Sequence, residues 1–149
     1  MPSGEASAAV EPTGVSNRSL LVSDDEQLLN AARELIRRRF KEGRHHVAAS
    51  LRDNQGKVFN AVHLEATVGR VAICAEAIAL GAALVDGDAV IDAIVAVDRN
   101  GDVVPPCGMC REMIADYSPN ARVIVSSETG TEAIPISSLL PFMGKRSIL

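Results

Sequence analysis

The chain has 149 residues, of which 47% are hydrophobic and 23% charged, and its net charge is −4 at pH 7. This length suits a single domain with a real core, and the composition excludes wholesale disorder. The acidic balance argues against a dedicated nucleic-acid-binding protein, and no run approaches the roughly 18 apolar residues that a membrane span needs. Because the N-terminal residues lack the features of a signal peptide, we expect a soluble cytoplasmic protein without a membrane partner.

The first part of the chain predicts a flexible tail and then an amphipathic helix. Residues 1–22 are rich in Ser, Ala, Gly and Pro and lack periodicity. From Ser23 to Phe40, apolar residues recur at helical spacing, and the helix is expected to end near Gly43. Ser23 and Glu26 have the spacing of a capping box, which predicts a helix start at Ser23. We therefore assign residues 1–22 to a tail and residues 23–149 to one domain.

The remaining segments alternate between predicted strands and helices. Short runs rich in Val and Ile predict strands, and two of them flank a turn sequence at 53–56 as a β-hairpin. Longer Ala-rich or amphipathic runs predict helices. This pattern favours an α/β fold with helices on both faces of one sheet. The predicted strands are 47–51, 57–64, 91–97 and 122–126, and the predicted helices are 72–85, 108–117 and 137–140.

Three cysteines carry the strongest functional signal. Cys74 falls at the start of one predicted helix, and Cys107 and Cys110 fall at the start of another. A helix N-terminus stabilises a thiolate through its free amide groups and its partial positive charge. If the two helix starts lie side by side, three thiolates can hold one Zn²⁺ and leave a fourth position open, as in a catalytic zinc site.

Glu76 lies two residues after Cys74, in the first turn of the same predicted helix. A carboxylate there is placed to exchange protons with water beside the metal without binding the metal itself. Cys74-Ala75-Glu76 followed by Pro106-Cys107-Gly108-Met109-Cys110 matches the signature of the zinc-dependent deaminases, with Cys in place of the usual His ligand.

Two other interpretations of these cysteines stay open. A redox pair at Cys107 and Cys110 would leave Cys74 and Glu76 unexplained. A structural, non-catalytic zinc domain would need a fourth ligand, and three histidines in or beside the predicted hairpin are available for this role: His45, His46 and His63.

From about His45 to Leu140 the chain resembles the cytidine deaminase superfamily in its small three-cysteine class, and most closely the bacterial blasticidin S deaminases. The resemblance rests on the zinc motif, on His63-Leu64-Glu65 and on Gly69-Arg70-Val71. It implies a three-layer α/β/α sandwich with a mixed five-stranded sheet and one zinc ion per chain. It also implies a homotetramer in which neighbouring subunits help to close each site.

The resemblance, together with the local chemistry, gives roles to further residues. Glu76 is expected to move protons between water, the N3 atom of a cytosine ring and the leaving amine. Arg111 is expected beside the cysteines, drawing charge from their sulfur atoms. Phe142 is expected to stack on the pyrimidine, the alternative being that it fills the core. The expected substrate-binding residues are His45, His63, Glu65, Arg70, Ala75 and Phe142.

The substrate prediction depends on departures from the usual cytidine deaminase pattern. His63 stands where those enzymes have an Asn, His45 where they have a Phe, and Ala77 where many have an Arg. Donors and cations suit blasticidin S, which has a carboxylate on its sugar ring, so we expect blasticidin S to be the substrate. The alternative is a cytidine or deoxycytidine deaminase of pyrimidine salvage. A nucleic-acid-editing deaminase is disfavoured because it needs a basic groove and stacking aromatic residues, whereas this chain has a net charge of −4 and only four aromatic residues.

Overall fold

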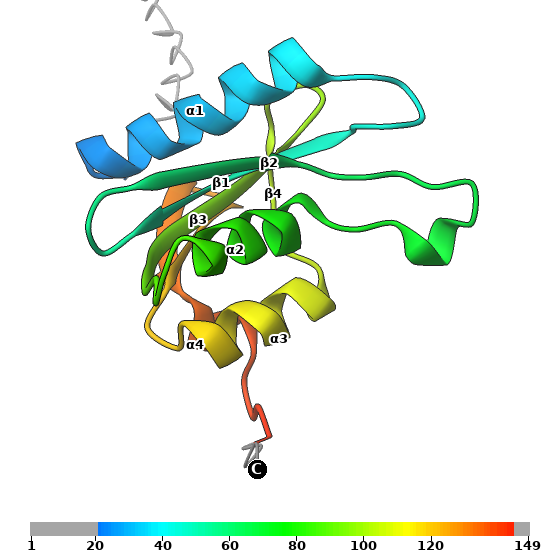
Figure 1. Ribbon diagram of the computed structural model, residues 1–149. Helices are drawn as coiled ribbons and strands as arrows, with labels where there is room; N and C mark the ends of the chain where they lie inside the picture. Colours follow the sequence, from blue (N-terminus) through cyan, green and yellow to red (C-terminus); the bar gives the residue numbers. More distant parts are fainter. Residues whose placement is uncertain (1–20, 145–149) are drawn as a thin grey trace, which may run out of the picture.

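The computed structural model describes residues 21–144 and contains a mixed β-sheet between two helical layers (Figure 1). The strand order is β2-β1-β3-β5-β6, and the short β4 pairs with one end of β3. Strands β3 and β5 are parallel, whereas the other paired strands are antiparallel. The predicted α/β class and mixed sheet are thus confirmed. The strands are β1 (Val47–Asp53), β2 (Val58–Val62), β3 (Ile91–Asp98), β4 (Val103–Val104), β5 (Arg122–Ser127) and β6 (Gly130–Pro135).

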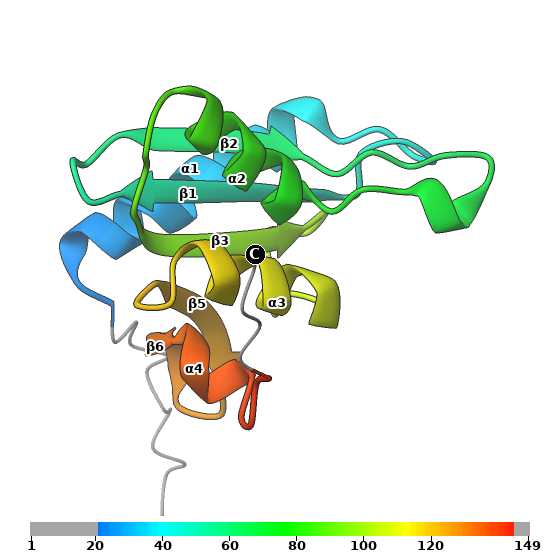
Figure 2. The same ribbon diagram turned by 60° about the horizontal axis from the view of Figure 1, so that its bottom comes forward.

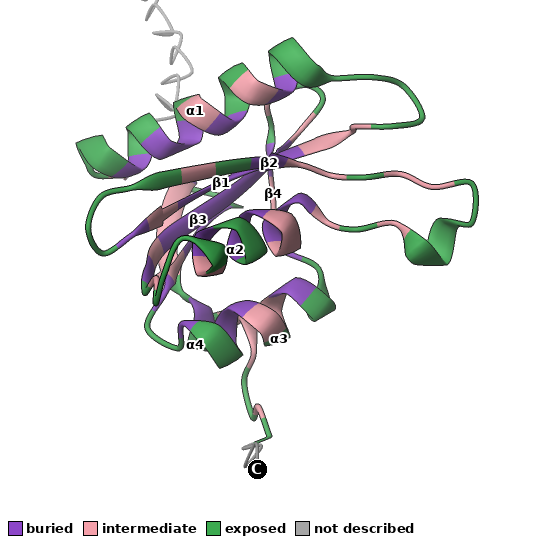
Figure 3. Ribbon diagram, viewed as in Figure 1, coloured by how far each residue is buried: buried purple, intermediate pink, exposed green. Residues whose placement is uncertain are grey.

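Helices cover both faces of the sheet (Figures 1 and 2). On one face, α1 (Ser23–Arg39) packs with Leu28, Ala32 and Ile36 against residues of the central strands. The other face carries α2 (Ala75–Val85), α3 (Gly108–Tyr117) and α4 (Ile136–Leu139). Buried residues are concentrated on the central strands and on the sheet-facing sides of the helices (Figure 3). The expected three-layer arrangement is therefore present.

The N-terminus of α1 differs in detail from its prediction. The helix begins at Ser23 as expected, but the proposed capping box is wrong, because the Ser23 hydroxyl lies 3.4 Å from the Asp24 carboxylate and no side chain caps the helix. Ser23 already has helical geometry, so the N-cap is Val22, whose carbonyl oxygen accepts hydrogen bonds from the Asp25 and Glu26 N–H groups. Residues 1–20, which make up most of the predicted tail, lie outside the described residues.

Several other element boundaries also differ from the prediction. No strand was predicted between residues 126 and 137, but residues 130–135 form strand β6, because antiparallel pairing with β5 supplies its backbone partners. Strand β4 and the short 3₁₀ helix η1 (Gly69–Val71) were not predicted either. Helix α2 begins at Ala75, three residues later than predicted, since Ala72 and Cys74 have extended backbones.

No helix within residues 21–144 is long and apolar enough to cross a membrane. The longest helix, α1, has 17 residues, and charged residues occupy its exposed side.

A cluster of four charged side chains connects α1 to three strands. Asp25, in the first turn of α1, is 1% exposed and accepts hydrogen bonds from Arg52 on β1 at 2.8 Å and from Arg122 on β5. The same two arginines donate to Asp92 on β3. Burial would raise the pKa of Asp92, but the hydrogen bonds from Arg52 and Arg122 outweigh it and hold this pKa below its ordinary value.

We predict that Asp25→Ala strongly destabilises the fold. The substitution would leave Arg52 and Arg122 without the buried carboxylate that balances their charge, so the free energy of unfolding should fall by about 3–5 kcal/mol. Urea denaturation measures this difference. Asp24→Ala, which removes the neighbouring exposed carboxylate, is the matched control and should change stability by no more than about 0.5 kcal/mol. Similar losses in both variants would contradict a structural role for the cluster.

Candidate metal and substrate site

The starts of α2 and α3 bring the three cysteines together. Cys74 is the N-cap residue of α2, Cys107 is the N-cap residue of α3, and Cys110 lies in the first turn of α3. Their three Sγ atoms all lie within 4.8 Å of one another. Both helix N-termini therefore direct their free amide groups and partial positive charge toward one cluster of sulfur atoms.

The cluster has the dimensions of a zinc site. The Sγ atoms of Cys74 and Cys107 are 3.6 Å apart, too far for a disulfide bond of roughly 2.05 Å. Two thiolates bound to one tetrahedral zinc lie about 3.8 Å apart, given Zn–S distances of roughly 2.3 Å. Within residues 21–144, no histidine or carboxylate belongs to this group. The residues present thus fit a zinc ion with three protein ligands, and the histidines do not supply a fourth.

The electrostatic environment differs among the three thiols. Burial raises the pKa of Cys74 and raises that of Cys110 much further, and the nearby Glu76 carboxylate adds to the effect on Cys110. For Cys107, burial is outweighed by hydrogen bonds that include the Cys110 N–H group, so its pKa is lowered. A bound cation would favour the thiolate form of all three, because metal binding displaces the thiol protons.

Glu76 is a buried carboxyl group beside this cluster. It lies in the first turn of α2, is 6% exposed, and lines the same cavity as Cys74 and Cys107. Burial raises its pKa, and hydrogen bonds from its own N–H group and from the Cys110 thiol offset this only in part. A carboxyl group with a raised pKa holds its proton more firmly than an ordinary one, which suits a group that both accepts and donates a proton.

The cavity beside the cysteines has a volume of about 170 Å³. Val104 and Pro105 give it an apolar wall that the sequence analysis did not identify, although the Pro105-Pro106 pair before Cys107 was a signal of extended chain there. Its volume is below the roughly 300–1,000 Å³ of small-molecule sites. Its lining residues are Val47, His63, Cys74, Ala75, Glu76, Val104, Pro105 and Cys107.

Hydrogen bonds fix the orientation of His63 at this cavity. Its Nδ1 atom accepts a hydrogen bond from the His46 N–H group at 3.0 Å, and its carbonyl oxygen accepts one from His45 Nδ1 at 2.9 Å. The neutral ring therefore carries its proton on Nε2, which lies 3.5 Å from the Glu65 carboxylate. His46 was expected only as a possible zinc ligand, whereas its backbone N–H group orients the His63 ring.

The other expected substrate-binding residues lie at different distances from the cavity. Ala75 is fully buried and lines it, whereas Glu65 reaches it only through its contact with His63. His45, Arg70 and Phe142 are absent from the cavity lining formed by residues 21–144. The Phe142 side chain is fully exposed, which excludes the alternative that it fills the core.

Arg111 connects the loop before Cys107 to α4. Its Nε donates to the Pro106 carbonyl oxygen at 2.8 Å, and its Nη1 donates to the Leu139 carbonyl oxygen at 3.2 Å. These bonds use backbone acceptors rather than a cysteine sulfur atom. Arg111 is therefore placed to hold the backbone next to Cys107.

Comparison with known proteins relates this site to zinc-dependent enzymes. Residues 22–127 match the family described as "Cytidine and deoxycytidylate deaminase zinc-binding region". The chain is 40% identical over 131 residues to the blasticidin-S deaminase of Bacillus cereus, which covers 83% of this chain and 94% of that protein. It is 33% identical over 100 residues to the cytidine deaminase of Halalkalibacterium halodurans, covering 66% of this chain and 76% of that protein.

A solved structure supports the same relation. The crystal structure of cytidine deaminase from Burkholderia pseudomallei aligns with a TM-score of 0.66 at 28% sequence identity. The alignment covers 78% of this chain and 96% of that chain.

We predict that Cys74→Ser lowers the zinc content of the purified protein to a small fraction of one ion per chain, because only two thiolate ligands remain. Atomic emission spectroscopy measures the metal, and far-UV circular dichroism separates loss of zinc from loss of the fold. Met109→Ala alters an exposed residue between Cys107 and Cys110 and should keep its zinc. Full zinc retention in Cys74→Ser would be evidence against a three-cysteine site.

Proposed function

Because the chain belongs to the cytidine and deoxycytidylate deaminase family, we propose that it hydrolyses the C4 amino group of a free cytosine nucleoside and releases ammonia. The observation that carries this proposal is the buried Glu76 carboxyl group, which shares a cavity with Cys74 and Cys107. A structural zinc site has no need of an acid/base group with a raised pKa beside its ligands. The proposed domain comprises residues 23–149.

Each chain is proposed to hold one zinc ion through Cys74, Cys107 and Cys110. When bound, the metal supplies a Lewis acid that makes water more acidic. Arg111 contributes by holding the Pro106 carbonyl group, which fixes the backbone that carries Cys107. The N-termini of α2 and α3 stabilise the negative charge of the three thiolates.

Glu76 moves the protons of the reaction. It accepts a proton from water as the oxygen atom adds to C4, and it delivers this proton to N3 of the ring. It then takes the remaining proton from the new C4 hydroxyl group and passes it to the amino group, so that ammonia departs as the C4 carbonyl group forms. The products are the 4-oxo ring and ammonia, so the atoms of one water molecule are fully accounted for. The burial of Glu76 makes this shuttle effective, because it raises the carboxyl pKa toward neutrality.

The cavity walls suit a flat pyrimidine ring. Val104 and Pro105 provide apolar contacts, and the Ala75 backbone is proposed to hold the polar edge of the base. Ala75 is the first residue of α2, where the N–H group has no partner within the helix. A ring bound against these groups would lie beside the Glu76 carboxyl group.

We infer that the preferred substrate is blasticidin S rather than cytidine. The 40% identity to a blasticidin-S deaminase supports this choice, and so does His63, whose Nε2–H group can donate to a carboxylate. Glu65 is proposed to accept from a hydroxyl or amino group that either ligand provides. His45 is proposed to position His63 by donating a hydrogen bond to its carbonyl oxygen. Arg70 is proposed to form an ion pair with the ligand carboxylate.

A homotetramer is proposed to complete the site. The cavity that residues 21–144 form in one chain is too small for a whole nucleoside, so further walls must come from elsewhere. Arg70 and Phe142 are exposed in the single chain and free to reach the cavity of a neighbouring copy, where Phe142 would stack on the ring. Sedimentation of the active protein as a monomer would refute this part of the proposal.

We predict that Glu76→Gln abolishes most of the activity and leaves the metal in place. The amide cannot transfer protons, so kcat should fall by about 10²–10⁴-fold or more. Ammonia release from blasticidin S, cytidine and deoxycytidine measures the activity, and metal analysis of the same sample measures zinc. A variant that retains its zinc and its full turnover would rule out Glu76 as the acid/base. No turnover of any substrate by the unmodified protein would favour a non-catalytic zinc domain.

We predict that His63→Asn shifts specificity from blasticidin S toward cytidine. Loss of one charge-assisted hydrogen bond to the ligand carboxylate should reduce the ratio of kcat/KM values by about tenfold to a hundredfold. Glu65→Gln is the matched comparison, because Glu65 is expected to contact both ligands and should lower both kcat/KM values together. A preference of the unmodified enzyme for cytidine would contradict the substrate assignment and support the pyrimidine salvage alternative, while leaving the deaminase assignment intact.

A further inference from the structure

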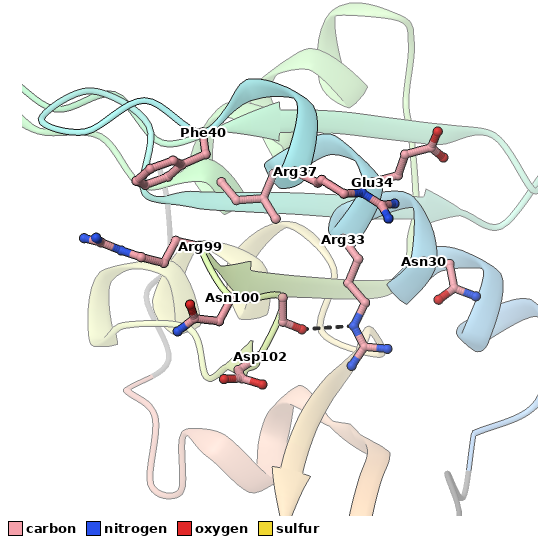
Figure 4. A pocket seen from close by; sticks show the side chains of 10 residues that line it. Asn30, Arg33, Glu34, Arg37, Phe40, Arg99, Asn100 and Asp102 are labelled. Carbon is pink, nitrogen blue, oxygen red and sulfur yellow. Dashed lines mark hydrogen bonds between the residues drawn. The ribbon is translucent and has the colours of Figure 1, made fainter.

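A second, larger hollow lies between α1 and the turn that joins β3 to β4 (Figure 4). Its volume is about 730 Å³, within the range of small-molecule sites and more than that of the cavity beside the cysteines. One wall is a stripe along α1 and its C-terminal end, and the other is the turn at 99–102. The main polar and aromatic lining residues are Asn30, Arg33, Arg37, Phe40, Arg99 and Asn100.

Two contacts connect the walls of this hollow. Arg33 reaches from α1 to the turn, where its Nε atom donates to the Gly101 carbonyl oxygen at 2.9 Å (Figure 4). Arg99 lies over the ring of Phe40, with its guanidinium carbon 5.1 Å from the ring centroid, and donates to Glu42 at 3.0 Å. Each contact uses only part of a guanidinium group, which has five N–H donors. Both arginines are thus held in position, and each keeps further N–H donors that a ligand can use.

Arg37 differs from these two arginines. It lies one helical turn after Arg33 on the same side of α1, and the described residues give it no hydrogen bond, ion pair or ring contact. Its side chain is exposed, so its guanidinium group is available to a ligand. Three arginine residues therefore line one hollow of a chain whose net charge is −4, and the guanidinium group of Arg99 points away from those of Arg33 and Arg37 (Figure 4).

We propose that this hollow binds a small molecule that carries phosphate groups. Guanidinium groups bind phosphate oxygens through paired, charge-assisted hydrogen bonds, and Arg33 and Arg37, one helical turn apart, offer two such groups to a compact polyanion. The Phe40 ring and the amide groups of Asn30 and Asn100 add surfaces and hydrogen bonds suited to a nucleoside. A nucleoside diphosphate combines these features.

The carboxylates of the hollow favour a compact ligand over a nucleic acid. Glu34 and Asp102 also line it, so its formal charge is +1 rather than +3. An extended strand of RNA or DNA would bring phosphates close to these carboxylates. A small ligand can place its few phosphates beside Arg33 and Arg37 without extending along the whole hollow. The proposal concerns residues that take no part in the proposed deamination, so either can fail without the other.

Isothermal titration calorimetry of the zinc-containing protein tests the proposal, with inorganic pyrophosphate and adenosine diphosphate as probes at constant ionic strength. We expect saturable binding of at least one probe. Equal affinities would identify a site for the phosphate groups alone, and tighter binding of the diphosphate nucleoside would show that the nucleoside is also recognised. Absence of binding by both probes would overturn the proposal, as would tighter binding of a single-stranded RNA oligonucleotide.

A pair of charge reversals locates the binding. Arg37→Glu should weaken binding by about tenfold or more, because it replaces a free donor group with a carboxylate. Arg38→Glu makes the same charge reversal in the same helical turn, but Arg38 does not line the hollow. The affinity of this variant for the probe should therefore stay within about twofold of that of the unmodified protein. Both variants have the same zinc site, so any binding of the probes to zinc contributes equally to the two measured affinities. Equal weakening would show attraction to net charge and refute the site.

Discussion

The structure depends above all on one constraint: two helices must begin at the same place, so that three thiols lie within 4.8 Å of one another. The parallel pair β3 and β5 determines where α3 begins. Helix α3 forms the crossover between these strands, so it starts beyond the carboxyl end of β3. Helix α2 lies beside α3 on the same face of the sheet (Figure 2). The parallel crossover thus places Cys107 and Cys110 where the start of α2 presents Cys74.

The sequence predicted those parts of the site that depend on short spacing. Cys74 and Glu76 are two residues apart at the start of α2, and Cys107 and Cys110 are three residues apart at the start of α3, so the short spacing was enough to place them. Contacts between distant segments were not predictable in this way. The pairing of β6 with β5 and the hydrogen bond from His46 to His63 depend on how the sheet brings segments together. For the same reason, the sequence did not reveal that Arg111 binds backbone carbonyl groups.

The size of the cavity beside the cysteines connects the proposed deamination to the proposed homotetramer. Burial of Glu76 requires close packing around the reacting atoms, and the same packing leaves about 170 Å³ beside the cysteines. In the proposed complex, the sugar of the nucleoside lies at the edge of this space, near His63 and Glu65. The residues expected to contact the sugar are half-buried or exposed in one chain. Of the proposed metal ligands, Cys110 is buried, Cys74 is half-buried and Cys107 is exposed, and the Glu76 carboxyl group is buried. The proposed proton transfer therefore takes place at a buried carboxyl group, whereas one metal ligand and the proposed sugar contacts lie nearer the surface.

The proposed phosphate site shares two segments with the deaminase site. The turn at 99–102 is followed by β4 and Pro105, and Val104 and Pro105 line the cavity beside the cysteines. The Phe40 ring lies 6.0 Å from that of His46, which in turn lies 5.5 Å from that of His63. Such contacts carry energetic coupling only if they have two arrangements that the ligands distinguish. Since coupling between two binding sites is reciprocal, a phosphate ligand whose affinity is unchanged by a bound nucleoside leaves nucleoside binding unchanged as well.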